Sequence, residues 1–164
     1  MTEVERKAEI TELQKQFEEL HNAAYEKNAD LAQERGRQFE KLVRAVFKAW
    51  GMLLRGSYHT GDNKSEQIDG VLQFEGRYAL LEAKWEKANL AASELFSFLG
   101  KVEGKFTGTI GVFVSRNELT SNFLTALRAG RRQCIIVIHG QDVDDLFDPA
   151  FDLASYLATQ GYCQ

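Results

Sequence analysis

The stretch from Gln67 to Trp85, QIDGVLQFEGRYALLEAKW, constrains the fold most strongly, because two runs of alternating character flank Glu75-Gly76. This pattern predicts a β-hairpin with a two-residue turn, in which Phe74 pairs with Arg77. One face of that hairpin is apolar and is expected to pack on the core: Ile68, Leu72, Phe74, Ala79, Leu81 and Trp85. A slip of one residue would turn acidic side chains into this face, so the apolar pattern fixes the register.

In this register Asp69 lies directly across from Glu82, and Gln67 lies across from Lys84, which it is expected to help position. Side chains alternate along a strand, so Asp69, Glu82 and Lys84 project from one face. Opposed Cβ atoms are roughly 4.5–5.5 Å apart, which would bring the two carboxylates almost into contact. Like charges at that distance repel, and a divalent cation relieves the repulsion because it prefers carboxylate oxygens. A metal site is therefore favoured here over a solvated sheet edge.

Two helical patterns precede the hairpin. Residues 3–34 contain no Gly or Pro and favour helix. They carry an apolar seam with the spacing of a coiled coil: Ile10, Leu13, Phe17, Leu20, Ala24 and Leu31. The seam suits either a second chain or packing back onto the domain, and both alternatives stay open. Gly36 is expected to separate this arm from a second helix, RQFEKLVRAVFKAWG, which ends near Gly51 and carries Glu40 at the margin of its apolar arc.

The remaining segments predict alternating strands and helices. MLLRGSY reads as a strand and HTGDNKSE as a polar loop before the hairpin. After it come a helix from Asn89, its expected N-cap, to Gly104, the strand TIGVFVS, a helix capped by Thr120 or Ser121, and the strand CIIVIHG. Both strands are continuous apolar runs, typical of parallel strands buried on both faces. We therefore expect an α/β fold, with a mixed central sheet, flanking helices and a long N-terminal helix.

Charge is distributed unevenly along the 164 residues, whose net charge is −4. Residues 1–34 hold 4 basic and 9 acidic side chains, residues 35–140 hold 16 basic and 10 acidic, and residues 141–164 hold five Asp and no Lys or Arg. The basic central segment allows a polyanionic partner without requiring one.

The sequence gives little evidence for a membrane protein, a secreted protein or an enzyme of another class. No apolar run approaches the roughly 20 residues of a membrane span, and the beginning of the chain shows no secretory signal. Cys134 and Cys163 are too isolated for a disulfide framework or a zinc site, which favours a reducing, cytoplasmic setting. Glycine-rich phosphate loops and nucleophile elbows are absent from the sequence, which argues against NTP hydrolysis and serine-hydrolase chemistry.

The pattern IDG on one strand and EAK on the next resembles the PD-(D/E)xK nuclease superfamily, whose Asp, Glu and Lys form the active site on an αβββαβ core. Ile68 stands where the signature has Pro. The wider segments GRQFEKLVRAVF, ELFSFLGKVEGKFTGTIGVFVSRNELTSNFLTAL and CIIVIHGQDVDDLF are similar to the Mrr-type (type IV) restriction endonuclease domain. The resemblance covers roughly residues 36–147, leaving residues 1–35 as an N-terminal helical arm and residues 148–164 as a C-terminal helical tail.

The resemblance implies a role for each site residue. Asp69 and Glu82 would hold Mg²⁺, for which Mn²⁺ would substitute, and the backbone carbonyl of Ala83 would be a further ligand. Lys84 would orient the attacking water or stabilise charge that develops on the phosphorus. Glu40 matches the acid on the first helix that often completes the metal site.

The implied function is that of a Mg²⁺-dependent endonuclease that cleaves DNA in restriction or other defence. The arm at residues 1–35 would bring two chains together, or a partner subunit would supply target recognition. Contacts with DNA are expected from basic side chains near the motif and at the ends of later elements: Arg55, His59, Lys64, Lys87 and Arg116. The alternatives are a catalytically silent nucleic-acid-binding or assembly module of the same fold, and a nuclease that acts on RNA or branched DNA.

Overall fold

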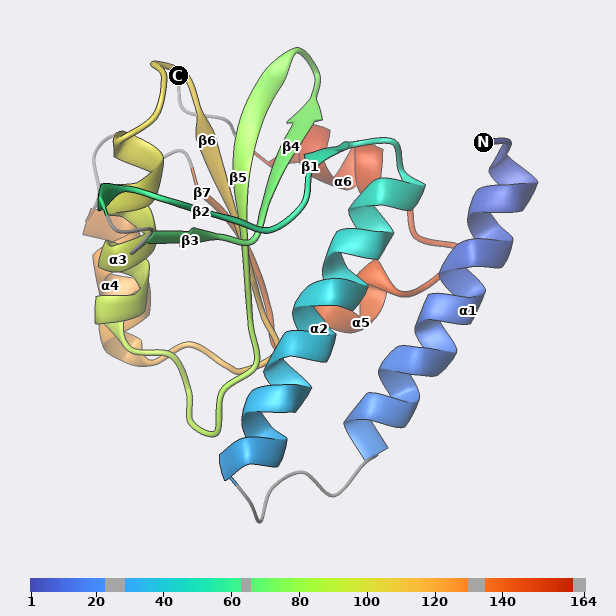
Figure 1. Cartoon of the computed structure of the whole chain (residues 1–164), viewed down its shortest axis with the longest axis horizontal. Coiled ribbons are helices and arrows are strands. Elements are labelled where there is room, and N and C mark those ends of the chain that lie inside the picture. Colours follow the sequence, from blue (N-terminus) through green and yellow to red (C-terminus); the bar gives the residue numbers. More distant parts are fainter. Residues whose placement is uncertain (23–28, 63–65, 130–134, 161–164) are drawn as a thin grey trace.

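The structure is a computed structural model that describes residues 1–22, 29–62, 66–129 and 135–160. The strands are β1 Leu53–Arg55, β2 Tyr58–Thr60, β3 Glu66–Ile68, β4 Gly70–Phe74, β5 Arg77–Lys84, β6 Ile110–Ser115 and β7 Ile135–His139. The helices are α1 Glu3–Asn22, α2 Ala29–Ala49, α3 Ala92–Glu103, α4 Ser121–Ala129, α5 Asp142–Leu146 and α6 Leu153–Thr159 (Figure 1). Within the described residues, no helix combines the length and the apolar character needed to cross a membrane.

Five strands form one mixed sheet in the order β1-β4-β5-β6-β7, and β2 and β3 form a separate two-stranded ribbon. The β1, β4 and β5 strands pair antiparallel, whereas β5, β6 and β7 pair parallel. The two apolar runs predicted to be parallel strands are β6 and β7. The prediction of an α/β fold with a mixed sheet and flanking helices is confirmed.

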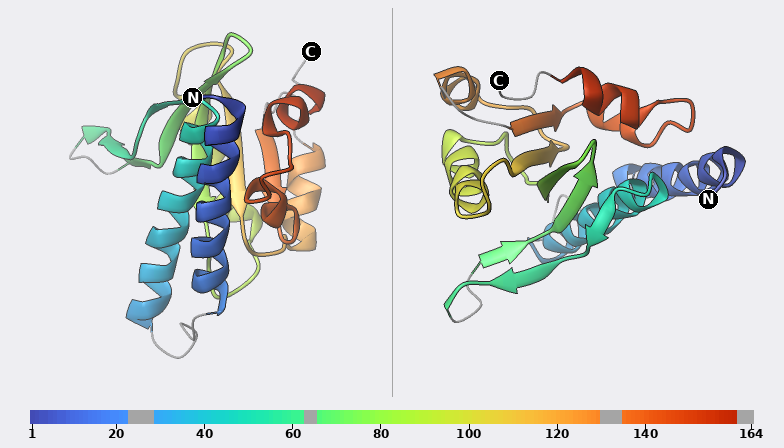
Figure 2. Two further views of the ribbon diagram at one scale, coloured as in Figure 1. Left: turned by 90° about the vertical axis from the view of Figure 1, so that its right-hand side faces the viewer. Right: turned by 90° about the horizontal axis from the view of Figure 1, so that it is seen from above.

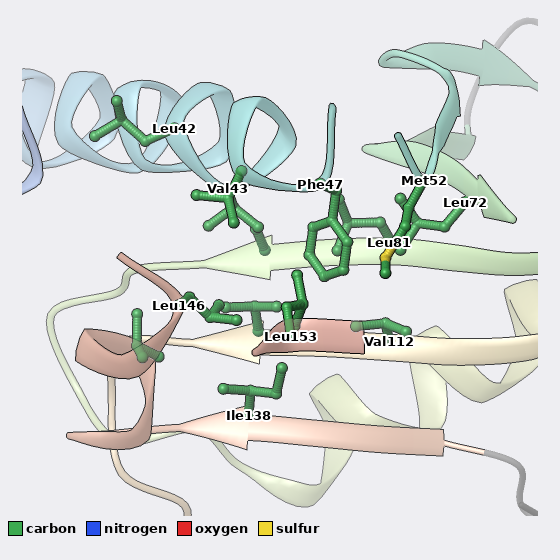
Figure 3. Close-up of a cluster of buried hydrophobic side chains, with 14 of the residues drawn as sticks. Leu42, Val43, Phe47, Met52, Leu72, Leu81, Val112, Ile138, Leu146 and Leu153 are labelled. Carbon is green, nitrogen blue, oxygen red and sulfur yellow. The ribbon is translucent and has the colours of Figure 1, made fainter. Parts of the chain in front are cut away.

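Helices cover both faces of the sheet (Figure 2). On one face α2 lays Val43 and Phe47 over Leu81 of β5 and Val112 of β6, and α5 and α6 extend the same cluster (Figure 3). On the other face α3 and α4 pack around Phe113 of β6. The central strands are therefore buried on both sides, which explains their continuous apolar sequences.

The N-terminal helix α1 packs on its own chain. Its seam is buried, and the Phe17 ring stacks on Phe147 with 4.3 Å between ring centroids. The four seam positions within α1 are Ile10, Leu13, Phe17 and Leu20. Ala24 lies outside the described residues, and Leu31, in α2, is 44% exposed. Because α2 begins at Ala29, the expected break at Gly36 is wrong: that glycine lies inside a helix.

The hairpin register is confirmed from Phe74↔Arg77 outward to Gly70↔Leu81. Beyond that pair the ladder ends at Asp69, and β3 pairs with β2 instead of β5. The segment 59–66, expected to be a polar loop, holds His59 and Thr60 of β2 and Glu66 of β3, and the strand expected at 52–58 is divided between β1 and the start of β2.

Two expectations for side chains near this break are wrong. Gln67 pairs with His59 of β2 and not with Lys84. Ile68 packs in the cluster under α3 and not on the face of Leu72 and Leu81. The cause is the change of strand partner at Asp69, which separates β3 from the alternation of β4.

The capping predictions for the later helices have mixed outcomes. α3 begins after Ala91, because Leu90 forms a bridge with Leu119, so Asn89 does not cap it. Gly104 ends α3 as expected. Thr120 caps α4, with its hydroxyl oxygen accepting a hydrogen bond from the Phe123 amide at 3.2 Å.

Candidate active site

A cavity of about 1160 Å³ opens where β5 ends, between α2, the β2–β3 ribbon and α3. Glu82 and Lys84 occupy alternate positions of β5, so both side chains leave the strand on the side covered by α3. The cavity lining includes the expected site residues: Glu40, Gln67, Asp69, Glu82, Ala83 and Lys84. The structure thus brings together side chains from α2, the ribbon and β5.

Asp69 is fixed in place where the hairpin ladder ends. Its side chain reaches β5, where Oδ2 accepts a hydrogen bond from the Ala83 amide at 2.9 Å. Its other oxygen, Oδ1, accepts a hydrogen bond from the Gln67 side-chain amide at 3.2 Å. Gln67 therefore supports Asp69, although it was expected to support Lys84. Only 7% of Asp69 is exposed, so this hydrogen-bonded carboxylate is almost fully enclosed where the ladder ends.

Glu82 and Lys84 contact each other and also contact α3. Lys84 Nζ lies 3.5 Å from Glu82 Oε1 and 2.9 Å from Glu94 Oε2. On the other side of the carboxylate, Lys101 Nζ lies 3.2 Å from Glu82 Oε2. The sequence did not point to Glu94 and Lys101, which α3 adds to the cavity lining.

Burial sets the electrostatics of the two carboxylates. It raises the pKa of Asp69, while the hydrogen bond from Ala83 and the charges of Lys101 and Arg44 oppose that rise. It also raises the pKa of Glu82, against the lowering effect of Lys101 and Lys84. Both acids thus bind protons more readily than free side chains, and a cation placed between them would restore their ionised forms.

Glu40 and Lys84 also have shifted pKa values. Burial and the charge of Asp69 raise the pKa of Glu40 to about 7, although Arg44 Nη1 lies 3.9 Å from its carboxylate. Burial acts to lower the pKa of Lys84, but the hydrogen bond to Glu94 and the charge of Glu82 outweigh it and raise that pKa. Lys84 is therefore an ammonium ion at neutral pH.

The donor set suits a hard cation that keeps part of its water shell. No group of three or more Asp, Glu, His or Cys side chains in the described part of the chain could hold a metal ion. Among the carboxylates that line the cavity, Asp69 and Glu82 lie where the hairpin ends, together with the peptide group of Ala83. Mg²⁺ typically takes one or two carboxylates and completes its coordination with waters and substrate phosphate, so the residues present fit it.

The residues expected to contact DNA lie in different settings. Lys87 is exposed and lines the cavity, and His59 is exposed on the ribbon. Arg55 stacks over the Tyr58 ring at 3.9 Å, and Lys64 lies outside the described residues. Arg116 is away from this cavity: its guanidinium donates to the Gly140 carbonyl at 2.7 Å and lies 3.8 Å from Asp144, joining β6 to the end of β7.

A mixed sheet with this strand order, and an Asp, a Glu and a Lys gathered at the end of its central hairpin, define a PD-(D/E)xK-type, restriction-endonuclease-like domain. A family model described as restriction endonuclease, for the Mrr catalytic domain, matches residues 31–147. The chain therefore belongs to the Mrr-type restriction endonuclease family.

A solved structure supports the same fold. The MspJI restriction endonuclease, in complex with a 27-mer oligonucleotide, superposes with a TM-score of 0.50 at 16% sequence identity. The match covers 94% of this chain but only 36% of that one, so the chain spans little more than a third of the MspJI chain. A comparison with curated proteins finds no match.

Proposed function

We propose that this chain is a metal-dependent endonuclease that hydrolyses DNA phosphodiester bonds in restriction or other defence against foreign DNA. The observation that carries the proposal is the shared cavity of Asp69, Glu82 and Lys84, with Asp69 held against β5 by the Ala83 amide. Membership of the restriction endonuclease family supports nuclease chemistry. The oligonucleotide bound to MspJI supports DNA as the substrate class.

In this proposal Asp69 and Glu82, with the carbonyl oxygen of Ala83, hold Mg²⁺, and Mn²⁺ can take its place. The bound ion supplies a polarised phosphoryl oxygen and a water of lowered pKa. The hydrogen bonds from Gln67 and Ala83 orient the Asp69 carboxylate before any ion or substrate arrives. This preorganisation reduces the rearrangement needed to assemble the site.

Lys84 acts on the substrate itself. Its ammonium, placed beside Glu82, orients the attacking water or stabilises negative charge that develops on the scissile phosphate. Glu40, on α2, lines the same cavity, and with a pKa of about 7 it can accept or donate a proton at neutral pH. It would act either as a further acidic contact or as a proton acceptor for the water.

The DNA backbone would bind along the same cavity. Its lining carries four further cationic side chains on α2 and after β5: Arg37, Lys41, Arg44 and Lys87. Contacts of this kind make affinity fall with salt but carry no sequence information. Target recognition would then come from a partner subunit.

The direct test is incubation of the purified protein with plasmid DNA, branched DNA and RNA, in Mg²⁺, in Mn²⁺ and in EDTA. We expect DNA cleavage with either ion and none in EDTA. Asp69→Asn and Lys84→Ala should each reduce the rate by about 100-fold or more, as removal of a transition-state contact does. Lys48→Ala is the control, because Lys48 is exposed on α2 and does not line the cavity.

Each other outcome has a definite meaning. Cleavage that persists in Lys84→Ala would contradict the mechanism. Cleavage of RNA or branched DNA alone would change the substrate and leave the site intact. Binding of DNA without cleavage in any metal would favour a catalytically silent module of the same fold.

A further inference from the structure

Lys101 occupies one side of the carboxylate on which the proposed metal site depends. Its Nζ lies 3.2 Å from Glu82 Oε2, and both side chains are mostly buried, with exposed fractions of 19% and 10%. Lys101 comes from α3 and lies far from the hairpin in sequence. It also lowers the pKa of both Glu82 and Asp69, so its charge acts on the two acids together.

In this structure every oxygen of the two carboxylates faces a donor. Asp69 Oδ1 and Oδ2 accept hydrogen bonds from Gln67 and Ala83. Glu82 Oε1 faces Lys84, and Oε2 faces Lys101. A divalent ion that coordinates Glu82 through Oε2 must therefore approach the oxygen that the Lys101 ammonium already contacts.

Lys101 is the donor that can leave with the least disturbance. Lys84 is also held by Glu94 at 2.9 Å, so it remains anchored if its contact with Glu82 weakens. Lys101 extends from a separate helix on a flexible four-carbon stem, which allows its ammonium to swing away. A metal ion about 2.1 Å from Oε2 and an ammonium at the same oxygen would repel each other strongly in a largely buried site.

We propose that Lys101 is a resident counter-ion of Glu82 that a divalent cation must displace, so that Lys101 sets the affinity of the site for the metal. The inference rests on the proposed function, because it takes Glu82 to be a metal ligand. Lys101 is thus a regulating residue rather than a catalytic one. It keeps Glu82 in an ion pair while no cation is bound. Binding of a cation breaks this ion pair between α3 and β5, which lowers the affinity for the cation.

The chain offers a matched control just after the end of α3. Lys105 lies four residues after Lys101, and its Nζ is also 3.2 Å from a carboxylate, that of Glu66. The exposed fractions of that pair are 25% and 30%. Neither Lys105 nor Glu66 is among the residues that line the cavity. Removing the Lys105 charge therefore changes a similar ion pair without touching the proposed metal ligands.

The test is a Mn²⁺ titration without DNA, followed by the electron paramagnetic resonance signal of free Mn²⁺. We expect Lys101→Met to bind Mn²⁺ about tenfold more tightly than the wild type, within the usual range for coupling between neighbouring sites. Lys105→Met should bind like the wild type. Lys101→Arg, which keeps the charge, should show no gain.

Thermal unfolding gives a second readout. Without cation, Lys101→Met should melt at a lower temperature than the wild type, because Glu82 has lost a partner. On addition of Mn²⁺ its melting temperature should rise by more than that of the wild type. If Lys101→Met does not fold, Lys101→Gln is used instead. Glutamine removes the charge but keeps a hydrogen-bond donor toward Glu82. The same gain in Mn²⁺ affinity is expected of this variant.

Unchanged or weaker Mn²⁺ binding in the neutral variants would overturn the inference. The variant Glu82→Gln then distinguishes a failure of the inference about Lys101 from a failure of the proposed metal site. If Glu82→Gln abolishes Mn²⁺ binding while Lys101→Met leaves it unchanged, the metal site stands and the role of Lys101 falls. If Mn²⁺ binds equally to the wild type, Glu82→Gln and Lys101→Met, both the metal site and the role of Lys101 fall.

Discussion

Glu40 illustrates how the cavity acts on a single residue. Burial and the nearby charge of Asp69 raise its pKa from 4.5 to about 7, and only 24% of its side chain is exposed. The folded protein therefore holds a proton on Glu40 more tightly than the unfolded chain does. The contribution of Glu40 to stability is full below about pH 4.5 and is lost progressively as the pH rises to about 7.

Glu40→Gln should show this dependence directly. Glutamine mimics the protonated acid at every pH, so the variant should melt at a higher temperature than the wild type at pH 8 and at nearly the same temperature at pH 5. Thermal unfolding followed by circular dichroism in EDTA measures both. Glu18→Gln, at an exposed position of α1 outside the cavity, is the control for the substitution itself and should leave the melting temperature nearly unchanged. An equal effect of Glu40→Gln at the two pH values would contradict the proposed origin of the shift.

The sequence located the hairpin residues of the candidate site better than those on α3. Asp69, Glu82 and Lys84 could be placed together because strand alternation and a short turn leave little freedom. Glu94 and Lys101 share one margin of the apolar arc of α3, seven residues apart, a signal that the sequence does contain. What the sequence does not contain is which margin of α3 faces the end of β5, because that depends on tertiary packing.

At the scale of elements, the hairpin could be predicted because its turn residues and its apolar alternation favour the same strand register. Glu75 and Gly76 have positive φ angles of 49° and 73°, as a tight two-residue turn requires, and the apolar alternation selects one register. The end of the ladder at Asp69 could not be predicted in the same way. There a side chain, and not another strand, accepts the hydrogen bond of the Ala83 amide. Such a contact between distant residues leaves no periodic signal in the sequence.

The contact between α3 and β6 depends on a glycine. A Cβ added at Gly111 would lie 2.6 Å from Cε1 of Phe98 and 3.1 Å from a side-chain atom of Ile135. Phe98 is fully buried and packs edge-on against Phe113, so its ring has little room to move. The absence of a side chain at Gly111 therefore sets how closely α3, which carries Glu94 and Lys101, approaches the sheet.

Gly111→Ala should destabilise the protein by roughly 1–3 kcal/mol, the usual cost of overpacking a core. Urea unfolding measures the change. Gly100→Ala is the matched control, because Gly100 is exposed within α3 and a Cβ there would meet nothing within 4 Å. In a helix interior that control should stabilise by about 0.5–1 kcal/mol. A neutral effect of Gly111→Ala would mean that α3 can shift away from β6 at little cost.

At the scale of the whole molecule, α1 is part of the core although it lies outside the matched family region at residues 31–147. Its seam residues are buried, and Phe17 is surrounded by aromatic rings from α2, from the segment after β5 and from the C-cap of α5: Phe39, Trp85 and Phe147. A seam with coiled-coil spacing can pack against a second chain or against its own domain equally well, so the sequence alone did not distinguish dimerisation from packing within one chain. In the structure the surface proposed for a homodimer is covered by the same chain.

Phe17→Ala tests whether this intramolecular packing holds in solution. Deleting a fully packed aromatic ring should cost about 3–5 kcal/mol of unfolding free energy. If the seam is filled within one chain, that loss should be the same at low and high protein concentration, and the wild-type urea midpoint should not depend on concentration. Val4→Ala, at a position of α1 that is 78% exposed, is the control and should change little. A wild-type midpoint that rises with protein concentration, and loses that dependence in Phe17→Ala, would instead assign the seam to a contact between two chains.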